Sequence, residues 1–251
     1  MARKKILFGN WKMNNTLAEA KAFCSSAREL TELAAKKDVV IGVAPSYLSL
    51  AYVSEHKEGL RVYAEEVHYK DHGAYTGNVS IPMVKEVGVT GSLVGHSERR
   101  TYEKESDFDC HLRIDALIAN GMDAMYCVGE TLKEFEAGQT KDIIKSQILV
   151  GLLGVKEEDL KRVIIAYEPV WAIGTGKNAS EEIAEDICSY IRSLIAEKYS
   201  PKAAEEIEIL YGGSVKPNNI HGYLSQKDVD GALVGGASLT GENFKALIEN
   251  L

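Results

Sequence analysis

The chain has 251 residues, a formal net charge of −8 and four cysteines. A chain of this length can bury a large core, and α/β barrels of this size are commonly one domain. Its acidic balance, with no clustered basic face, argues against binding nucleic acid. The cysteines are far apart, which indicates reduced thiols and neither a disulfide framework nor a zinc site: Cys24, Cys110, Cys127 and Cys188.

The N-terminus has charged residues ahead of the apolar run Ile6–Gly9, as a signal peptide would. That run is too short and is interrupted at once by Asn10 and Lys12. No stretch approaches the ~18 apolar residues needed to span a membrane. We therefore expect a cytoplasmic protein that does not enter a membrane.

Short apolar or β-branched runs alternate with longer amphipathic segments from end to end. The runs predict eight strands, near Ile6–Trp11, Val39–Ala44, Leu60–Ala64, Gly91–Val94, Asp123–Val128, Val163–Tyr167, Ile207–Tyr211 and Gly231–Val234. Several of these runs are apolar throughout, which is typical of parallel strands covered by helices.

The segments between the strands carry helix signals. Thr16 and Glu19 form a capping box, and apolar residues follow at helical spacing: Leu17, Ala20, Cys24, Ala27, Leu30 and Ala34. Ser106 and Ser180 begin two further helices, and Gly121 can end the first of these. Eight βα units favour an α/β, single-domain (β/α)8 barrel over residues 1–251, with eight parallel strands ringed by helices. Periodicity alone leaves a doubly wound sheet open.

A carboxylate, Glu168, follows the sixth apolar run directly. Pro169 biases Glu168 towards an extended conformation and ends the strand. Gly174–Gly176 then forms a loop that can act as a hinge before the next helix. A base fixed on a strand beside a closing loop suits a reaction whose intermediate must be kept from water. The alternative is a surface loop with an incidental glutamate.

Other unusual residues also follow predicted strands, and in a barrel these strand ends meet on one face. They are Asn10, Lys12, His96, the Gly212–Ser214 segment and the Gly235–Gly236 pair. The two glycine-rich ends together predict a phosphate site, because glycine backbones can approach an anion closely. A Walker motif is rejected at Lys177, because Trp171 and Asn178 do not fit it.

Two of these side chains have both a functional and an ordinary interpretation. His96 precedes a short helix whose positive end lowers the pKa of an imidazole, leaving a neutral N–H donor that can polarise a carbonyl. Lys12 could neutralise an anionic substrate and an oxyanion formed on it. The alternatives are a core histidine with satisfied hydrogen bonds and a solvated surface lysine. Cys127, at the end of strand five, is expected to pack and not to act as a nucleophile.

At these residues the chain resembles the triosephosphate isomerase family over its whole length. The matching motifs are Gly9–Asn14, Val94–Arg100, Tyr167–Lys177, Tyr211–Val215 and Leu233–Ala237. Five motifs in order with matching spacing are highly specific. The resemblance implies interconversion of dihydroxyacetone phosphate and D-glyceraldehyde 3-phosphate, a small triose phosphate substrate, without metal or cofactor.

The resemblance also implies roles for the catalytic residues. Glu168 would be the base that moves a proton between two carbons. His96 would donate to the enediolate oxygens, and Lys12 would stabilise their negative charge. Asn10 would help to orient the substrate, and Glu98 would lie just behind the catalytic residues.

The phosphate would bind to backbone N–H groups at Gly174, Ser214, Gly235 and Gly236. A lid over Pro169–Lys177 would close on the intermediate and hinder loss of phosphate. Two rival functions remain. One is another phosphate-binding barrel enzyme, such as an epimerase or an isomerase of a larger sugar phosphate. The other is a phosphate-binding barrel protein with impaired or no catalysis.

The family further implies a homodimer in which a loop of each subunit inserts beside the partner's site. The loop is Asp71–Gly77, with Thr76 at its tip. Several residues on the expected dimer surface depart from the common family pattern: Glu65, Glu66, Asn78, Glu103, Lys104 and Arg113. Two adjacent carboxylates in an interface cost desolvation unless they are protonated or paired. We expect normal chemistry with altered subunit affinity, unless both carboxylates reach solvent or backbone N–H groups.

Overall fold

The computed structural model describes residues 3–172 and 179–251. Eight parallel strands pair in chain order and close into a barrel: β1 Lys5–Asn10, β2 Val39–Ala44, β3 Arg61–Ala64, β4 Gly91–Val94, β5 Asp123–Val128, β6 Val163–Tyr167, β7 Glu208–Tyr211 and β8 Gly231–Val234. The predicted (β/α)8 barrel is confirmed, and the predicted strand ends agree closely with these bounds. Strand β1 closes the barrel by pairing with both β2 and β8.

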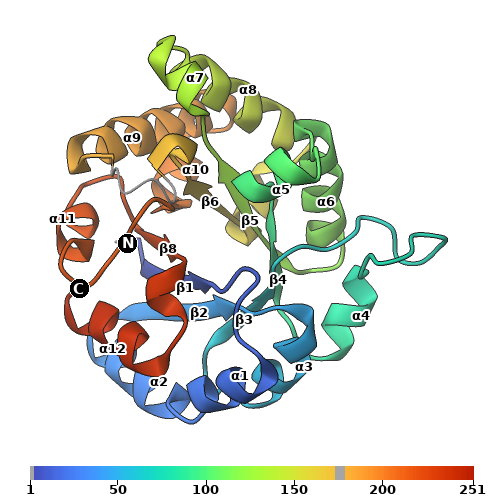
Figure 1. The fold of residues 1–251 in the computed structure, drawn as a ribbon. Helices are drawn as coiled ribbons and strands as arrows, with labels where there is room; N and C mark the ends of the chain where they lie inside the picture. The colour runs from blue at the N-terminus through green and yellow to red at the C-terminus, as the bar shows by residue number, and fades with distance from the viewer. Residues whose placement is uncertain (1–2, 173–178) are drawn as a thin grey trace.

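Helices surround the strands (Figure 1). They are α1 Leu17–Cys24, α2 Ala27–Lys36, α3 Tyr47–Glu55, α4 Ile81–Glu86, α5 Ser97–Tyr102, α6 Asp107–Ala119, α7 Leu132–Glu136, α8 Thr140–Gly151, α9 Glu181–Lys198, α10 Pro201–Glu206, α11 Ile220–Leu224 and α12 Gly241–Glu249. Short 3₁₀ segments are η1 Glu157–Arg162, η2 Val170–Ala172 and η3 Gly236–Ser238.

The helix starts lie where side chains can satisfy free backbone N–H groups. The Thr16 hydroxyl accepts from the Glu19 N–H, and the Glu19 carboxylate accepts from the Thr16 N–H, so the predicted capping box is present. Ser106 forms the same arrangement with Asp109 at the start of α6. Ser180 caps α9, as its position predicted.

The first helical stretch is divided, although its apolar spacing continues across the division. Helix α1 ends at Cys24 and α2 begins at Ala27. Between them the Ser25 hydroxyl donates to the Ala22 carbonyl at 2.6 Å. Serine side chains of this kind compete for helix carbonyls, which favours a break. Gly121, with a φ of 71°, follows α6 as expected of a helix-terminating glycine.

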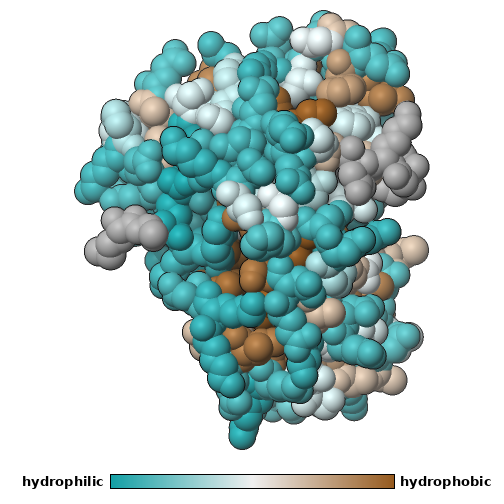
Figure 2. Space-filling model, turned by 90° about the vertical axis from the view of Figure 1, so that its left-hand side faces the viewer, coloured by the Kyte–Doolittle hydropathy of each residue, from teal (hydrophilic) through white to brown (hydrophobic). Residues whose placement is uncertain are grey.

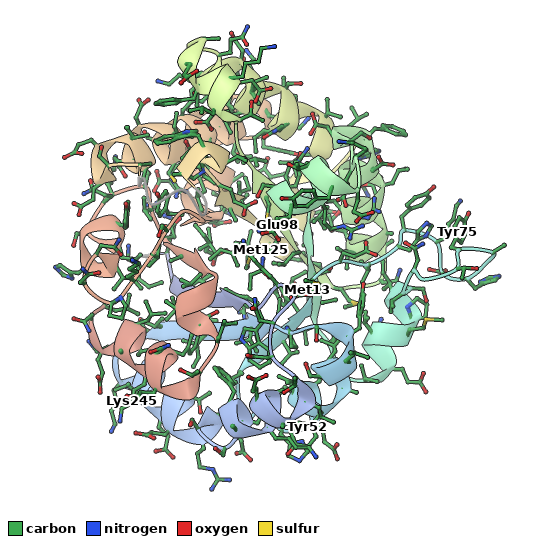
Figure 3. The ribbon with its side chains drawn as sticks, viewed as in Figure 1. Met13, Tyr52, Tyr75, Glu98, Met125 and Lys245 are labelled. Atoms are coloured by element: carbon green, nitrogen blue, oxygen red, sulfur yellow. The ribbon has the colours of Figure 1, made fainter. Side chains whose placement is uncertain are left out.

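Alternate residues of the strands form two apolar layers. One layer fills the barrel: Ile6, Phe8, Ala44, Tyr63, Leu93, Met125, Cys127, Ile164, Ala166, Leu210 and Leu233. Figure 3 shows Met125 within the ring of strands. The other layer, which includes Leu7 and Ile41, packs against the helices. Each fully buried large apolar side chain contributes about 1.5–3 kcal/mol, so the barrel gives the site a rigid base.

The segment between β3 and α4 extends away from the barrel (Figure 1). Residues 70–78 are exposed in the single chain, and Figure 3 shows Tyr75 on this projection. Within the described part of the chain, no helix combines the length and apolar character needed to cross a membrane.

Candidate active site

A cavity of about 680 Å³ opens at the carboxyl ends of the strands. It gathers most of the predicted site residues: Asn10, Lys12, His96, Glu98, Glu168, Ser214, Gly235 and Gly236. They lie at the carboxyl ends of β1, β4, β6, β7 and β8 or just after them, so these strand ends meet on one face as predicted. Gly174 lies outside the described residues. Thr76 is exposed on the projecting loop, apart from this cavity.

Glu168 and His96 are directly bonded at the floor of the cavity. The Glu168 side chain is almost fully buried, and its Oε1 lies 2.8 Å from His96 Nε2. Its Oε2 accepts from the Ser97 N–H at 3.1 Å. His96 Nδ1 accepts from the Glu98 N–H at 3.3 Å, at the start of α5. Because Nδ1 accepts, the ring proton belongs on Nε2, which donates to Glu168.

This contact changes the pKa of both groups. Burial alone raises the pKa of Glu168, but His96, the Ser97 N–H and Lys12 outweigh burial and hold the pKa below its ordinary value. Burial lowers the pKa of His96, but the Glu168 carboxylate outweighs burial and raises the pKa. The predicted lowering of the His96 pKa is therefore wrong, because the sequence does not show that Glu168 lies against the ring.

Lys12 occupies an unusual backbone position. Its φ is 53°, in the left-handed region that a lysine rarely adopts. Its N–H donates to Asn10 Oδ1 at 3.0 Å, and its Nζ lies 2.8 Å from Glu98 Oε1. Such strain, about 1–3 kcal/mol, persists where surrounding contacts hold it and often marks a functional position. Asn10 thus orients Lys12, and Glu98 contacts the Lys12 ammonium directly.

The other end of the cavity is lined by backbone. Gly235 and Gly236 follow β8, and Gly236 begins η3. An added Cβ on Gly236 would meet no heavy atom within 4 Å, and one on Gly235 would meet only Lys12 Cε at 3.7 Å. Packing therefore does not require glycine here. The missing side chains leave room for a ligand to reach the backbone N–H groups.

The chain after Glu168 is held by residues that sequence reasoning missed. The Val170 N–H donates to the Glu130 carbonyl at 3.2 Å, and Trp171 Nε1 donates to Glu130 Oε1 at 2.7 Å. The Phe135 ring stacks on Trp171 with centroids 4.3 Å apart. Glu130 lies two residues after the end of β5, and this position after a strand is the sequence feature that could have indicated it as a site residue. Residues 173–177 of the expected lid lie outside the described residues.

The two unusual carboxylates before the projecting loop differ from each other. Glu66 is buried, with Oε2 3.4 Å from Arg113 Nε and 3.9 Å from Arg99 NH2. Arg113 also donates to the Val67 carbonyl at 3.1 Å. Glu66 therefore meets the stated exception to the desolvation cost, because the arginine on α6 pairs with it.

Glu65 lacks such a pair. Its buried Oε1 has no hydrogen-bond partner among the described residues. Burial raises the pKa of Glu65 to about 7, with Glu98 also raising it, whereas His96 and Lys12 lower it. The desolvation hypothesis consequently applies to Glu65 alone.

Two further features of this face concern Cys127 and metal binding. Cys127 is fully buried, and burial raises its pKa well above the ordinary value, which agrees with a packing role. Over residues 3–172 and 179–251, no group of three or more His, Cys, Asp or Glu side chains is arranged to hold a metal ion.

Comparison with known proteins agrees with this geometry. The family model described as triosephosphate isomerase matches residues 5–251. The triosephosphate isomerase of Lactococcus lactis subsp. lactis (strain IL1403) is 43% identical over 250 residues, which cover 99% of each chain. That of Alkaliphilus metalliredigens (strain QYMF) is 44% identical over 246 residues, covering 98% of this chain and 99% of the relative.

Proposed function

The chain belongs to the triosephosphate isomerase family, and from this premise we propose how its residues carry out the reaction. The enzyme interconverts dihydroxyacetone phosphate and D-glyceraldehyde 3-phosphate, a step of glycolysis. The reaction moves one proton between neighbouring carbons through an enediolate, and one hydroxyl proton between the two oxygens on those carbons. It therefore needs a base, a donor to two oxygens, and a site that holds the phosphate.

Glu168 is the base in this proposal. Its lowered pKa keeps it ionised at neutral pH, and it lies at the cavity floor. Its Oε1 accepts a hydrogen bond from His96 Nε2 at 2.8 Å. The substrate must separate the two groups, so that the carboxylate faces a C–H bond and the ring faces the carbonyl oxygen. The main support for this proposal is that Glu168 and His96 are hydrogen-bonded to each other and both line one cavity.

His96 is the donor to the substrate oxygens. When the substrate displaces Glu168, the main cause of the raised His96 pKa is removed. Burial, Lys12 and the Glu98 N–H on Nδ1 remain, and all three favour the neutral ring. Nε2–H can then donate to either enediolate oxygen. The hydroxyl proton that leaves one oxygen is regained on the other, so the ring is unchanged at the end of the reaction.

Lys12 supplies positive charge, and the opposite end of the cavity binds phosphate. The ammonium at Lys12 lies within the cavity and stabilises the enediolate. The phosphate binds backbone N–H groups at Ser214, Gly235 and Gly236, with Gly174 as a further donor. The segment 169–177 acts as a lid that keeps water from the intermediate.

Two variants test this division of roles in a coupled assay. His96→Gln should lower kcat by about 100-fold with little change in KM, because the donor acts on developing charge. Gly236→Ala should lower kcat/KM at least about tenfold and weaken inhibition by inorganic phosphate, because its methyl group enters the ligand space. Its melting temperature should stay unchanged. Full activity in both variants would contradict the proposed site.

We also propose a homodimer assembled around loop 71–77. Large apolar side chains are exposed on the single chain: Met13 is 98% exposed, Leu48 92% and Tyr102 75%. Tyr75 projects on the loop, and Met13 lies on the segment after β1 (Figure 3). A subunit interface that covered these side chains would remove their apolar surface from water. The opposite side, with α11, is mostly hydrophilic, with apolar residues in a narrow central strip and towards the upper right (Figure 2).

Sedimentation equilibrium tests the dimer. The wild type should have twice the chain mass of 27.5 kDa. Tyr75→Asp should dissociate it, since a charge there would be desolvated, whereas Phe108→Asp on α6 serves as a control exposed apolar position. A monomeric wild type at micromolar concentration would contradict the proposal. A cytoplasmic location is also proposed, and the four free, buried cysteines support it.

A further inference from the structure

The backbone of Glu168 is enclosed between two glycines. The Glu168 N–H donates to the Val128 carbonyl at 2.7 Å, and the Gly212 N–H donates to the Tyr167 carbonyl at 2.7 Å. A Cβ on Gly129 would lie 1.7 Å from the Glu168 carbonyl oxygen, and one on Gly212 would lie 2.8 Å from Glu168 Cγ. Any displacement of either glycine backbone must therefore be transmitted to Glu168.

One buried side chain holds Gly129 in place. Gln147, on α8, accepts from the Gly129 N–H through Oε1 at 2.8 Å. Its Nε2 donates to the Gly129 carbonyl at 3.0 Å. Both polar groups of Gly129 are thus satisfied by a single amide, which acts like a neighbouring strand. Gln147 is only 7% exposed, so water does not compete strongly for these bonds.

Gln147 is itself anchored. The Tyr126 hydroxyl on β5 donates to the Gln147 carbonyl at 2.8 Å. The Tyr126 ring also lies where a Cβ on Gly151, one turn further along α8, would be 2.4 Å away. The helix therefore fits closely against β5, and the amide has little freedom to adjust.

We propose that Gln147 is a positioning residue for the isomerase reaction: its amide holds the Gly129 backbone against Glu168 and so sets where the carboxylate lies. The inference rests on the role of base proposed for Glu168. Gln147 does not line the main cavity and does not touch the phosphate end. Its loss should therefore affect the chemical step and leave substrate binding largely intact.

Gln147→Met tests the proposal, because methionine has a similar length and cannot make either hydrogen bond. In the coupled assay we expect kcat to fall at least about tenfold, with KM within about twofold of the wild-type value. A displacement of the base by about 1 Å can lower the rate about 100-fold. Gln226→Met is the matched control, because Gln226 donates to a helix carbonyl on α11 and should leave both constants unchanged. A folded Gln147→Met protein with wild-type kcat would overturn the inference.

Gln147→Glu provides a second readout that general destabilisation does not produce. A protonated carboxyl can accept from the Gly129 N–H and donate to its carbonyl, whereas the ionised form can only accept. The kcat of this variant should fall as pH rises, relative to wild type. A pH profile that superimposes on wild type would also overturn the inference. Glu168→Asp in the same series separates the two proposals: unchanged kcat there would reject the base itself, whatever Gln147 shows.

Discussion

At the residue scale, the bond between His96 and Glu168 determines the charge of both groups. Across their 2.8 Å contact, Glu168 raises the pKa of His96 and His96 lowers the pKa of Glu168. The proposed base is thus held in its ionised form, and the proposed donor carries its proton on Nε2. In the proposed reaction the substrate replaces this internal hydrogen bond.

Glu168→Gln should lower the pKa of His96. The carboxylate is what raises that pKa against burial, so removing its charge leaves burial and Lys12 to lower it. An NMR titration of the histidine ring in both proteins measures the change. An unchanged or higher His96 pKa in Glu168→Gln would show that another group sets it.

Glu65→Gln should stabilise the protein in a pH-dependent way. The folded-state pKa of about 7 is above the ordinary 4.5, so the native chain binds more protons between these values. Stability therefore falls as pH rises through this window, and the ionised carboxylate costs about 2 kcal/mol above it after allowance for solvent screening. Calorimetry at pH 8 should show a melting temperature roughly 4–8 °C higher for Glu65→Gln than for wild type. This increase in melting temperature should vanish near pH 4.5. An increase that does not depend on pH would show that the ionised Glu65 carboxylate is not its cause.

At the element scale, the buried pair between Glu66 and Arg113 joins the start of the projecting loop to α6. Removing one partner leaves the other charge buried, although Arg99 at 3.9 Å relieves part of the cost. Arg113→Met should therefore lower the free energy of unfolding by about 3 kcal/mol. Glu66→Gln in the same chain should restore at least about 1 kcal/mol, as denaturant titration would show. Strictly additive losses would mean that the pair is not coupled.

The loop between α5 and α6 contains a strained lysine. Lys104 has a φ of 57°, in the left-handed region that favours glycine. Lys104→Gly should stabilise the chain by about 0.5–1 kcal/mol, because glycine adopts this conformation without strain. Lys133→Gly, within α7, should instead destabilise it by about 1 kcal/mol. Equal effects of the two changes on the melting temperature would contradict this interpretation.

At the scale of the whole molecule, local patterns predicted most of the barrel. Strand bounds follow from apolar runs, and the Thr16, Ser106 and Ser180 caps follow from backbone hydrogen bonding. These signals lie within a few residues of one another, so they can be read along the chain. The five strand ends were placed together only because a barrel brings them to one face.

Contacts between distant segments were not predictable in the same way. His96 meets Glu168 across 72 positions, and Gln147 meets Gly129 through a helix packed on a strand. Which atoms touch depends on the rotation and tilt of whole elements. For the same reason the Glu66 pair with Arg113 was missed, although both departures from the family pattern were noticed.

The central claim is that Glu168 moves the proton in an otherwise complete site. The most direct measurement is glyceraldehyde 3-phosphate turnover in a coupled assay, for wild type and Glu168→Asp, over a wide range of protein concentration. Aspartate withdraws the carboxylate by one methylene, so we expect kcat to fall about 100-fold or more with the protein still folded. Wild-type specific activity should stay constant wherever the dimer persists. Equal turnover in the two proteins would contradict the claim.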